Sequence, residues 1–281
     1  MHSIQKLTVL LSATSLSGAF AGPLGKDSVN IEQRHSEHDS RTPNPFLSYQ
    51  GTPPGKEVQG GVKLRILSVG ASITVGFGKG TDGNGYRKRL RDDLRNKVVW
   101  AGTERNDKGD MEDGYFSAWS GKTVKYINDH IDPALEQRPN LILVFAGTND
   151  MNSNPKVSTE GNDPKETAER LKSMAEKMVY ECPDAAIILG MITNVCEDNR
   201  DQRERTKVYR EHIARVAGEL KSNGSHVLAA NFGPFRDSDL SDCTHPTQEG
   251  YQIMGHWWYD FVYQIPKGWI KAPIGPDPVR G

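Results

Sequence analysis

Residues 64–74 read Leu-Arg-Ile-Leu-Ser-Val-Gly-Ala-Ser-Ile-Thr, and this stretch decides the fold that we expect. The mostly apolar run 64–69 is short and ends at Gly70, which is typical of a buried β-strand. Ser72 stands just beyond that glycine, where the chain turns towards the next element. The stretch therefore predicts a strand that delivers a serine side chain at its carboxyl end.

Strands of this kind alternate with helices along the rest of the chain. We expect further strands at 97–100, 141–146, 185–192 and 226–230, and helices at 86–96, 123–135, 163–182, 202–222 and 247–263. Such alternation predicts an α/β protein with a parallel sheet and helices on both of its faces. In sheets of this type, ligands and reacting groups collect in loops beyond the carboxyl ends of the strands.

The domain organisation follows from length and local composition. At 281 residues the chain is long enough for one large α/β domain, which we expect at 62–265. A short apolar run followed by Ala19-Phe20-Ala21 has the form of a signal peptide, so we expect residues 1–21 to be removed and the protein to be secreted into the extracellular space. A buried N-terminal helix is the alternative, but nothing amphipathic follows to pack it. Residues 22–61 are polar, which predicts a flexible leader, and the proline-rich residues 266–281 predict an extended tail.

The charge balance excludes some classes of partner. The chain has 35 basic and 36 acidic side chains, for a formal net charge of −1. Nucleic acids and anionic membranes call for a basic surplus, so we expect neither as a partner. No later stretch is long and apolar enough for a transmembrane helix, so no membrane anchor is expected, and we expect a monomer.

Four polar clusters follow the predicted strands. They are Gly70-Ala71-Ser72-Ile73-Thr74, Ser120-Gly121, Gly147-Thr148-Asn149-Asp150 and Asp242-Cys243-Thr244-His245-Pro246. All four are expected at the same edge of the sheet, where the strands of a parallel sheet end.

These clusters contain the groups that acyl transfer requires. A serine hydroxyl becomes a nucleophile when a histidine within reach takes its proton, and a carboxylate fixes the tautomer of that histidine. Ser72, His245 and Asp242 are therefore the predicted nucleophile, base and acid. The backbone amides of Ser72 and Gly121 and the side-chain amide of Asn149 are the predicted oxyanion donors.

Each cluster also has an ordinary structural interpretation. Ser72 could be a helix N-cap, and Asn149-Asp150 could be a turn pair. A loop Asp-x-x-His such as 242–245 is common. The conjunction of all four clusters, each after a strand, favours the catalytic interpretation.

These residues resemble the four blocks of the SGNH hydrolase family, also called GDSL-like esterases and lipases, over residues 64–262. The resemblance implies a flavodoxin-like three-layer α/β/α sandwich with five central parallel strands. It also implies hydrolysis of esters through an acyl-enzyme, without a metal or an organic cofactor. Within the family, the blocks are similar to those of secreted microbial carbohydrate esterase family 3 acetylxylan esterases. A small ester or an acetylated carbohydrate is then the expected substrate. A lipase or lysophospholipase, or a catalytically inactive secreted binding module, remains the alternative.

Two positions depart from the family pattern. Ala71 stands where the family usually has Asp, and Cys243 stands where Gly is frequent. Cys196 and Cys243 both follow predicted strands, whereas Cys182 precedes one and lies at the opposite edge of the sheet. Because the Cα atoms of a disulfide must lie within about 7 Å, we expect a Cys196–Cys243 disulfide and a free Cys182.

Other motifs predict little or no further chemistry. The glycine-rich stretch 76–80 matches no nucleotide-binding pattern and is expected to form a flexible rim of the site. The acidic residues between 107 and 113 match no calcium loop, and we expect no metal. Asn223 begins an Asn-Gly-Ser sequon, so it is a predicted glycosylation site if the protein is secreted.

Overall fold

The computed structural model describes residues 46–280. The expected signal peptide, its cleavage site after Ala21 and residues 22–45 of the expected leader lie outside this range.

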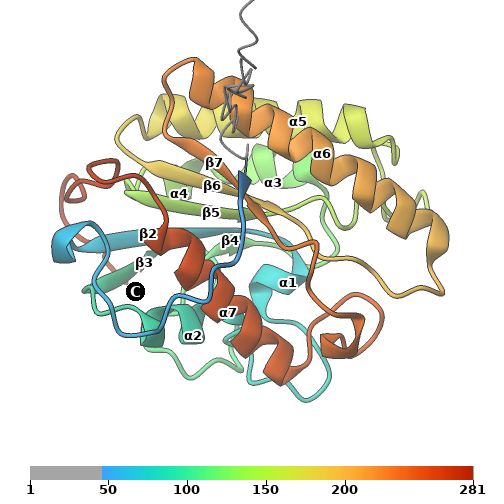
Figure 1. Ribbon diagram of the computed structural model, residues 1–281, viewed down its shortest axis with the longest axis horizontal. Helices are drawn as coiled ribbons and strands as arrows, with labels where there is room; N and C mark the ends of the chain where they lie inside the picture. Colours follow the sequence, from blue (N-terminus) through green and yellow to red (C-terminus); the bar gives the residue numbers. More distant parts are fainter. Residues whose placement is uncertain (1–45, 281) are drawn as a thin grey trace, which may run out of the picture. The chain divides into compact units, whose positions relative to one another are not determined.

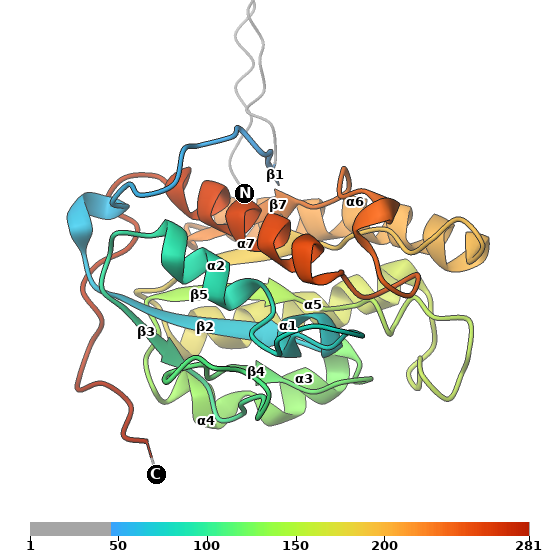
Figure 2. The same ribbon diagram turned by 90° about the horizontal axis from the view of Figure 1, so that it is seen from below.

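The described residues form one parallel sheet between two layers of helices (Figures 1 and 2). The strand order is β1-β7-β6-β5-β2-β3, with β4 paired to β2 beyond the end of β3. The strands are β1 (Phe46–Leu47), β2 (Leu64–Gly70), β3 (Val98–Ala101), β4 (Ser117–Ala118), β5 (Leu141–Phe145), β6 (Ala186–Met191) and β7 (Val227–Asn231).

The five strands predicted from the sequence are all present. Every residue of β2, β5 and β6 is buried, as expected for parallel strands covered on both faces. Strands β1 and β4 were not expected, because two residues are too few to show any apolar periodicity. Their presence gives seven strands instead of five, within the same three-layer α/β/α architecture.

Helices cover both faces of the sheet. They are α1 (Ser72–Val75), α2 (Tyr86–Asp93), α3 (Val124–His130), α4 (Asp132–Leu135), α5 (Pro164–Glu181), α6 (Arg200–Ser222) and α7 (Gln248–Tyr263), with 3₁₀ turns η1 (Gln59–Gly61) and η2 (Asp237–Asp239). On one face α2 packs against α7, and on the other α5 packs against α6 and α3 (Figure 1).

Local chemistry sets where these helices begin and end. The Asp163 carboxylate accepts hydrogen bonds from the amides of Lys165 and Glu166, which caps α5, and Pro164 occupies the first turn. The single helix predicted over 123–135 is instead divided into α3 and α4. Pro133 lacks the amide hydrogen that a continuous helix needs, so the chain breaks before it.

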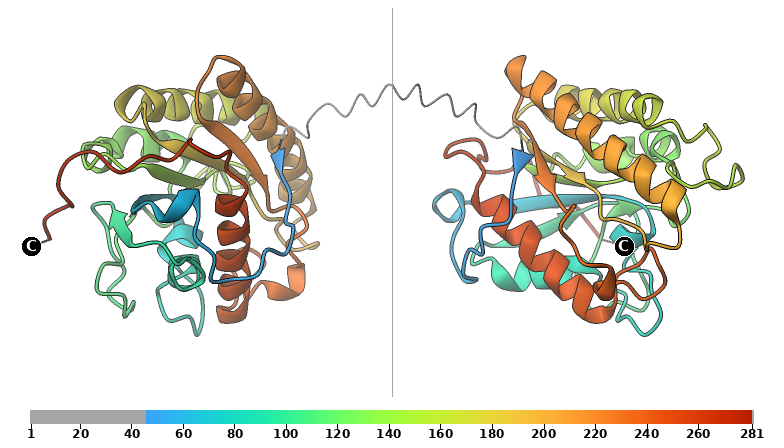
Figure 3. Two further views of the ribbon diagram at one scale, coloured as in Figure 1. Left: turned by 60° about the vertical axis from the view of Figure 1, so that its left-hand side comes forward. Right: turned by 45° about the vertical axis from the view of Figure 1, so that its right-hand side comes forward.

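The N-terminal part of the domain corrects the predicted leader boundary. Residues 46–61, which we name the strap, are ordered on the domain and run beside α7 (Figure 3). β1 pairs with β7, and the Asp260 carboxylate accepts hydrogen bonds from the amides of Gln50 and Thr52 at 2.9 and 2.8 Å. The strap is polar in sequence and is nevertheless ordered. Hydrogen bonds to a buried carboxylate hold it on the domain, where a stripe of apolar side chains would otherwise be needed.

The C-terminal tail crosses the beginning of β2. Arg65 is 1% exposed, and its guanidinium donates to the carbonyls of Ile274, Gly275 and Pro276 at 2.8 to 3.0 Å. Further on, the Arg280 guanidinium lies 3.7 Å from the centre of the Tyr115 ring. None of the helices within 46–280 has the length and apolar character needed to cross a membrane.

Candidate active site

Ser72 is the first residue of α1, immediately beyond the carboxyl end of β2. The turn between them requires glycine at position 70, because a Cβ atom there would lie 2.3 Å from the carbonyl oxygen of Phe145. β2 and β5 therefore approach closely at the point where the serine emerges. The serine is held at the rim of the sheet by this close backbone packing.

The loop after η2 brings His245 to Ser72. The Nε2 atom of His245 lies 2.8 Å from the Ser72 hydroxyl oxygen, although the two residues are 173 positions apart. The Nδ1 atom of the same ring lies 2.9 and 2.8 Å from the two carboxylate oxygens of Asp242. A carboxylate accepts hydrogen bonds only, so Nδ1 carries the ring proton and Nε2 is free to accept the serine proton.

Asp242 is oriented by the same loop. Its carboxylate accepts hydrogen bonds from the amides of His245 and Thr244 at 2.8 and 3.2 Å. Partial burial raises the pKa of Asp242, but the hydrogen bonds from the His245 amide and ring outweigh this effect and leave the pKa below its usual value. The carboxylate therefore stays ionised beside the histidine ring.

A disulfide closes this loop. The Cys196–Cys243 pair expected from the sequence is present, with a Cα–Cα distance of 4.5 Å, and Cys182 is free and buried. Cys243 has a φ of 69°, in the left-handed region that glycine adopts readily. This conformation gives a physical reason for the glycine that is frequent at this position in the family.

Gly121 and Asn149 line the same pocket as Ser72 and His245. Gly121 has a φ of 76°, and its α-carbon faces open space. The Asn149 side-chain nitrogen donates one hydrogen bond to the Lys122 carbonyl at 2.9 Å. An amide nitrogen has two hydrogens, so the second remains for a ligand.

Asp150 has a structural role that is not evident from its position in the sequence. It is fully buried, and its carboxylate accepts a hydrogen bond from the Val124 amide at 3.0 Å, at the beginning of α3. The Arg170 guanidinium lies 3.6 Å away. Burial raises the pKa of Asp150 to about 6. Together Asn149 and Asp150 attach the segment that contains Gly121 to the carboxyl end of β5. In the sequence, the signal for this role is the Asn149-Asp150 pair in the loop that follows the buried strand β5.

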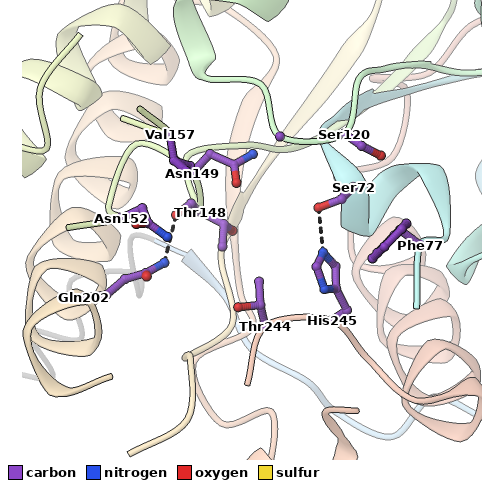
Figure 4. Close-up of a pocket in the computed structure, with 11 residues that line it drawn as sticks. Ser72, Phe77, Ser120, Thr148, Asn149, Asn152, Val157, Gln202, Thr244 and His245 are labelled. Carbon is purple, nitrogen blue, oxygen red and sulfur yellow. Dashed lines mark hydrogen bonds between the residues drawn. The ribbon is translucent and has the colours of Figure 1, made fainter. Parts of the chain in front are cut away.

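The pocket has a volume of about 430 Å³. Figure 4 shows Ser72 and His245 on one wall and Asn149, Asn152 and Gln202 on the other. Its remaining lining residues are Phe77, Ser120, Gly121, Thr148, Val157 and Thr244. In the sequence Phe77 is simply part of the glycine-rich stretch 76–80, yet its ring centre lies 4.8 Å from that of His245. Within residues 46–280 no group of three His, Cys, Asp or Glu side chains is arranged to hold a metal ion.

Comparison with known proteins agrees with this architecture. A multidomain esterase from Ruminococcus flavefaciens is 25% identical over 251 residues, which is 76% of this chain but only 30% of the length of that relative. Two solved structures have the same fold. A family 3 carbohydrate esterase from Clostridium thermocellum is 18% identical, with a TM-score of 0.58 over 72% of this chain and 96% of that one. A family 3 carbohydrate esterase from Talaromyces cellulolyticus is 17% identical, with a TM-score of 0.57 over 70% of this chain and 94% of that one.

A family-level comparison matches more than half of the chain. Residues 68–253 match the GDSL-like lipase/acylhydrolase family, and this range includes the Ser72, Gly121, Asn149 and His245 positions of the candidate site. The chain therefore belongs to the GDSL-like lipase/acylhydrolase family.

Proposed function

We propose that this protein is a serine esterase that hydrolyses short-chain, chiefly acetyl, esters on carbohydrate through an acyl-enzyme. The observation that carries the proposal is the chain of contacts from the Ser72 hydroxyl to His245 at 2.8 Å and from His245 to Asp242 at 2.8 Å. A serine, a histidine and a carboxylate in this order form the arrangement that activates a hydroxyl nucleophile.

In the first half of the reaction, the Ser72 oxygen attacks the ester carbonyl carbon while His245 takes the serine proton. The resulting tetrahedral intermediate carries its negative charge on the former carbonyl oxygen. The imidazolium of His245 then protonates the leaving alcohol, and the acyl group stays on Ser72. Asp242 stabilises the imidazolium throughout. A base positioned in this way contributes roughly 10²–10⁴ in rate.

The pocket also contains donors for the charged oxygen. The amides of Ser72 and Gly121 and the free hydrogen of the Asn149 side chain are the proposed donors. The Lys122 carbonyl holds the Asn149 amide at 2.9 Å before substrate arrives, so little reorganisation is needed during the reaction. Each such donor contributes on the order of 10²–10³ in rate.

In the second half, a water molecule attacks the acyl carbon of Ser72. His245 takes a proton from the water and returns one to the serine oxygen, which releases the carboxylic acid. The pocket is open to solvent, so water can reach the acyl group.

The lining of the pocket favours a sugar over a long acyl chain. Phe77 and Val157 are its large apolar residues, whereas most of the other side chains carry hydroxyl or amide groups. Burial of one methylene group against apolar surface stabilises binding by about 0.8 kcal/mol. A long acyl chain therefore gains affinity only where the pocket offers such surface. No aromatic residue of α7 lines this pocket, and Trp258 and Phe261 are fully buried in the core.

Replacement of the proposed nucleophile tests catalysis itself. For Ser72→Ala, we expect kcat/KM for p-nitrophenyl acetate to fall by a factor of about 10⁴ or more. Ser120→Ala, which removes another hydroxyl from the same pocket, should keep most of the activity. A wild-type protein as slow as Ser72→Ala would instead indicate an inactive binding module.

Acyl-chain preference separates the esterase from the lipase alternative. We expect kcat/KM for p-nitrophenyl acetate to exceed that for p-nitrophenyl octanoate, since within residues 46–280 Phe77 and Val157 are the only large apolar side chains that line the pocket for an eight-carbon chain to contact. Steady-state kinetics on the two esters measures this ratio. A strong preference for octanoate would favour a lipase or lysophospholipase.

The left-handed conformation of Cys243 predicts how the loop responds to loss of the disulfide. The Cys196→Ala/Cys243→Ala variant should lose roughly 2–4 kcal/mol of unfolding free energy. It should also lose about 10- to 100-fold in kcat, because displacement of His245 disturbs the reacting geometry. The Cys196→Ala/Cys243→Gly variant also lacks the disulfide but adopts a φ of 69° without strain. It should be about 1 kcal/mol more stable than the alanine variant and recover part of kcat. Equal losses in urea unfolding and in kcat would show that this conformation is not the constraint.

We also propose that the protein is secreted after cleavage following Ala21. Disulfides persist in oxidising compartments, and the Cys196–Cys243 pair is consistent with such a compartment. The remaining thiol, Cys182, is unreactive in character, since burial raises its pKa to about 11. N-terminal sequencing of the protein from the medium of a secreting host should begin at Gly22. Retention of the intact chain inside the cells would overturn this proposal.

Asn223 is exposed at the end of α6, and its glycosylation stays a prediction.

A further inference from the structure

A second cavity lies directly beside the candidate active site. It has a volume of about 450 Å³ and lies between the loop 75–81 and the loop 105–108. We name it the rim pocket. Phe77 lines both the rim pocket and the candidate active site, so one aromatic side chain is the wall between them. A volume of this size falls within the roughly 300–1,000 Å³ that is typical of small-molecule sites.

The main chain of Phe77 is anchored although its side chain is exposed. Phe77 is 52% exposed. Its main-chain amide and its main-chain carbonyl are both hydrogen-bonded. Its amide donates to the Ser72 carbonyl at 3.0 Å, and its carbonyl accepts from the Tyr251 hydroxyl at 2.7 Å. The Thr81 hydroxyl lies 3.0 Å from the carbonyls of Gly76 and Gly78. The predicted flexible rim is thus braced by hydrogen bonds, and the Phe77 ring extends from this anchored main chain.

The far side of the rim pocket carries unpaired charge. Arg105 and Lys108 are both exposed, and neither makes an ion pair with a carboxylate of residues 46–280. The Arg105 guanidinium lies 5.8 Å from the centre of the Tyr115 ring. Asp107 stands between the two cations in the chain, so the loop 105–108 has a surplus of one positive charge.

The backbone of this loop is also positioned. The Asn106 side chain donates to the Val75 carbonyl at 3.2 Å, and its oxygen accepts from the Lys108 amide at 3.1 Å. These contacts attach the charged loop to the segment that follows Ser72. A guanidinium and an ammonium that line the same pocket as an apolar ring offer a carboxylate both charge and directed hydrogen bonds. The Asp107 carboxylate can accept from sugar hydroxyls.

We propose that the rim pocket binds a carboxylate-bearing sugar of an oligosaccharide whose acetylated neighbouring residue occupies the candidate active site. Phe77 then packs against the sugar chain as it passes from one pocket to the other, and Arg105 and Lys108 bind the carboxylate. This inference rests on the proposed function for its substrate class. It goes further by assigning preference for acidic carbohydrate to a pocket that contains no reacting group.

Direct binding tests the proposal without relying on catalysis. The probe is a xylose oligosaccharide with one glucuronic acid branch and no acetyl group, and its partner is the same oligosaccharide with the carboxyl reduced to an alcohol. By isothermal titration calorimetry, wild-type protein should bind the acidic form at least about 10-fold more tightly, since hydrogen bonds to charged groups are lost with the reduced form. Added salt should weaken binding of the acidic form alone.

Paired variants locate the effect. Arg105→Gln/Lys108→Gln should bind the acidic oligosaccharide about as weakly as the reduced one. Arg95→Gln/Lys97→Gln makes the same change in charge at exposed positions just before β3, at the opposite edge of the sheet. It should leave the preference intact. Both variants should hydrolyse p-nitrophenyl acetate like the wild type, because neither changes a residue of the candidate active site.

The outcomes separate this inference from the proposed function. Equal binding of the two oligosaccharides by the wild type, absence of binding, or equal losses in both double variants would overturn the rim-pocket proposal. Failure to release acetate from acetylated oligosaccharides, with a preference for the acidic probe that depends on Arg105 and Lys108, would leave the pocket supported and overturn the proposed esterase substrate.

Discussion

The parallel pairing of β2 with β5, of β5 with β6 and of β6 with β7 is the constraint on which the candidate site depends. Parallel strands all end at the same edge, so loops from distant parts of the chain meet there. Ser72 follows β2, Asn149 follows β5, and the loop with Asp242 and His245 comes after β7. The buried core of the sheet sets the distance between these loops. A hydroxyl and a ring nitrogen 173 residues apart can therefore lie 2.8 Å from each other.

Short polar contacts then join the loops that meet at this edge of the sheet. Asn149 and Asp150 attach to the segment 122–124 through a carbonyl and an amide, and Asp242 holds both the amide and the ring of His245. The Cys196–Cys243 disulfide joins the loops that follow β6 and β7. Each of these contacts lies at the same edge of the sheet, so the geometry of the site is formed before any substrate binds. Such preorganisation is what stabilises developing charge most effectively.

The candidate active site and the rim pocket share the residue Phe77 and the backbone contacts that anchor it. Phe77 is fixed by the Ser72 carbonyl on one side and by Tyr251 of α7 on the other, so the wall of the rim pocket and the position of the proposed nucleophile depend on one another. A pocket lined mostly by hydroxyl and amide side chains, beside a pocket whose cations form no ion pair within residues 46–280, suits a polar, extended ligand better than an acyl chain. Charge here acts locally, because the chain as a whole has a net charge of only −1.

The sequence by itself determined the alternation of strands and helices, the five principal strands and the edge of the sheet where Ser72, Gly121, Asn149 and His245 gather. It could do so because apolar runs and their glycine ends are local signals. Tertiary structure alone decided the rest. β4 is two residues long and shows no period, and the strap is ordered by Asp260, which lies 210 residues from Gln50. The burial of Asp150 and the position of Phe77 against His245 likewise depend on which loops meet in space. Contacts of this kind arise from packing between segments far apart in the chain, and no pattern within either segment encodes them.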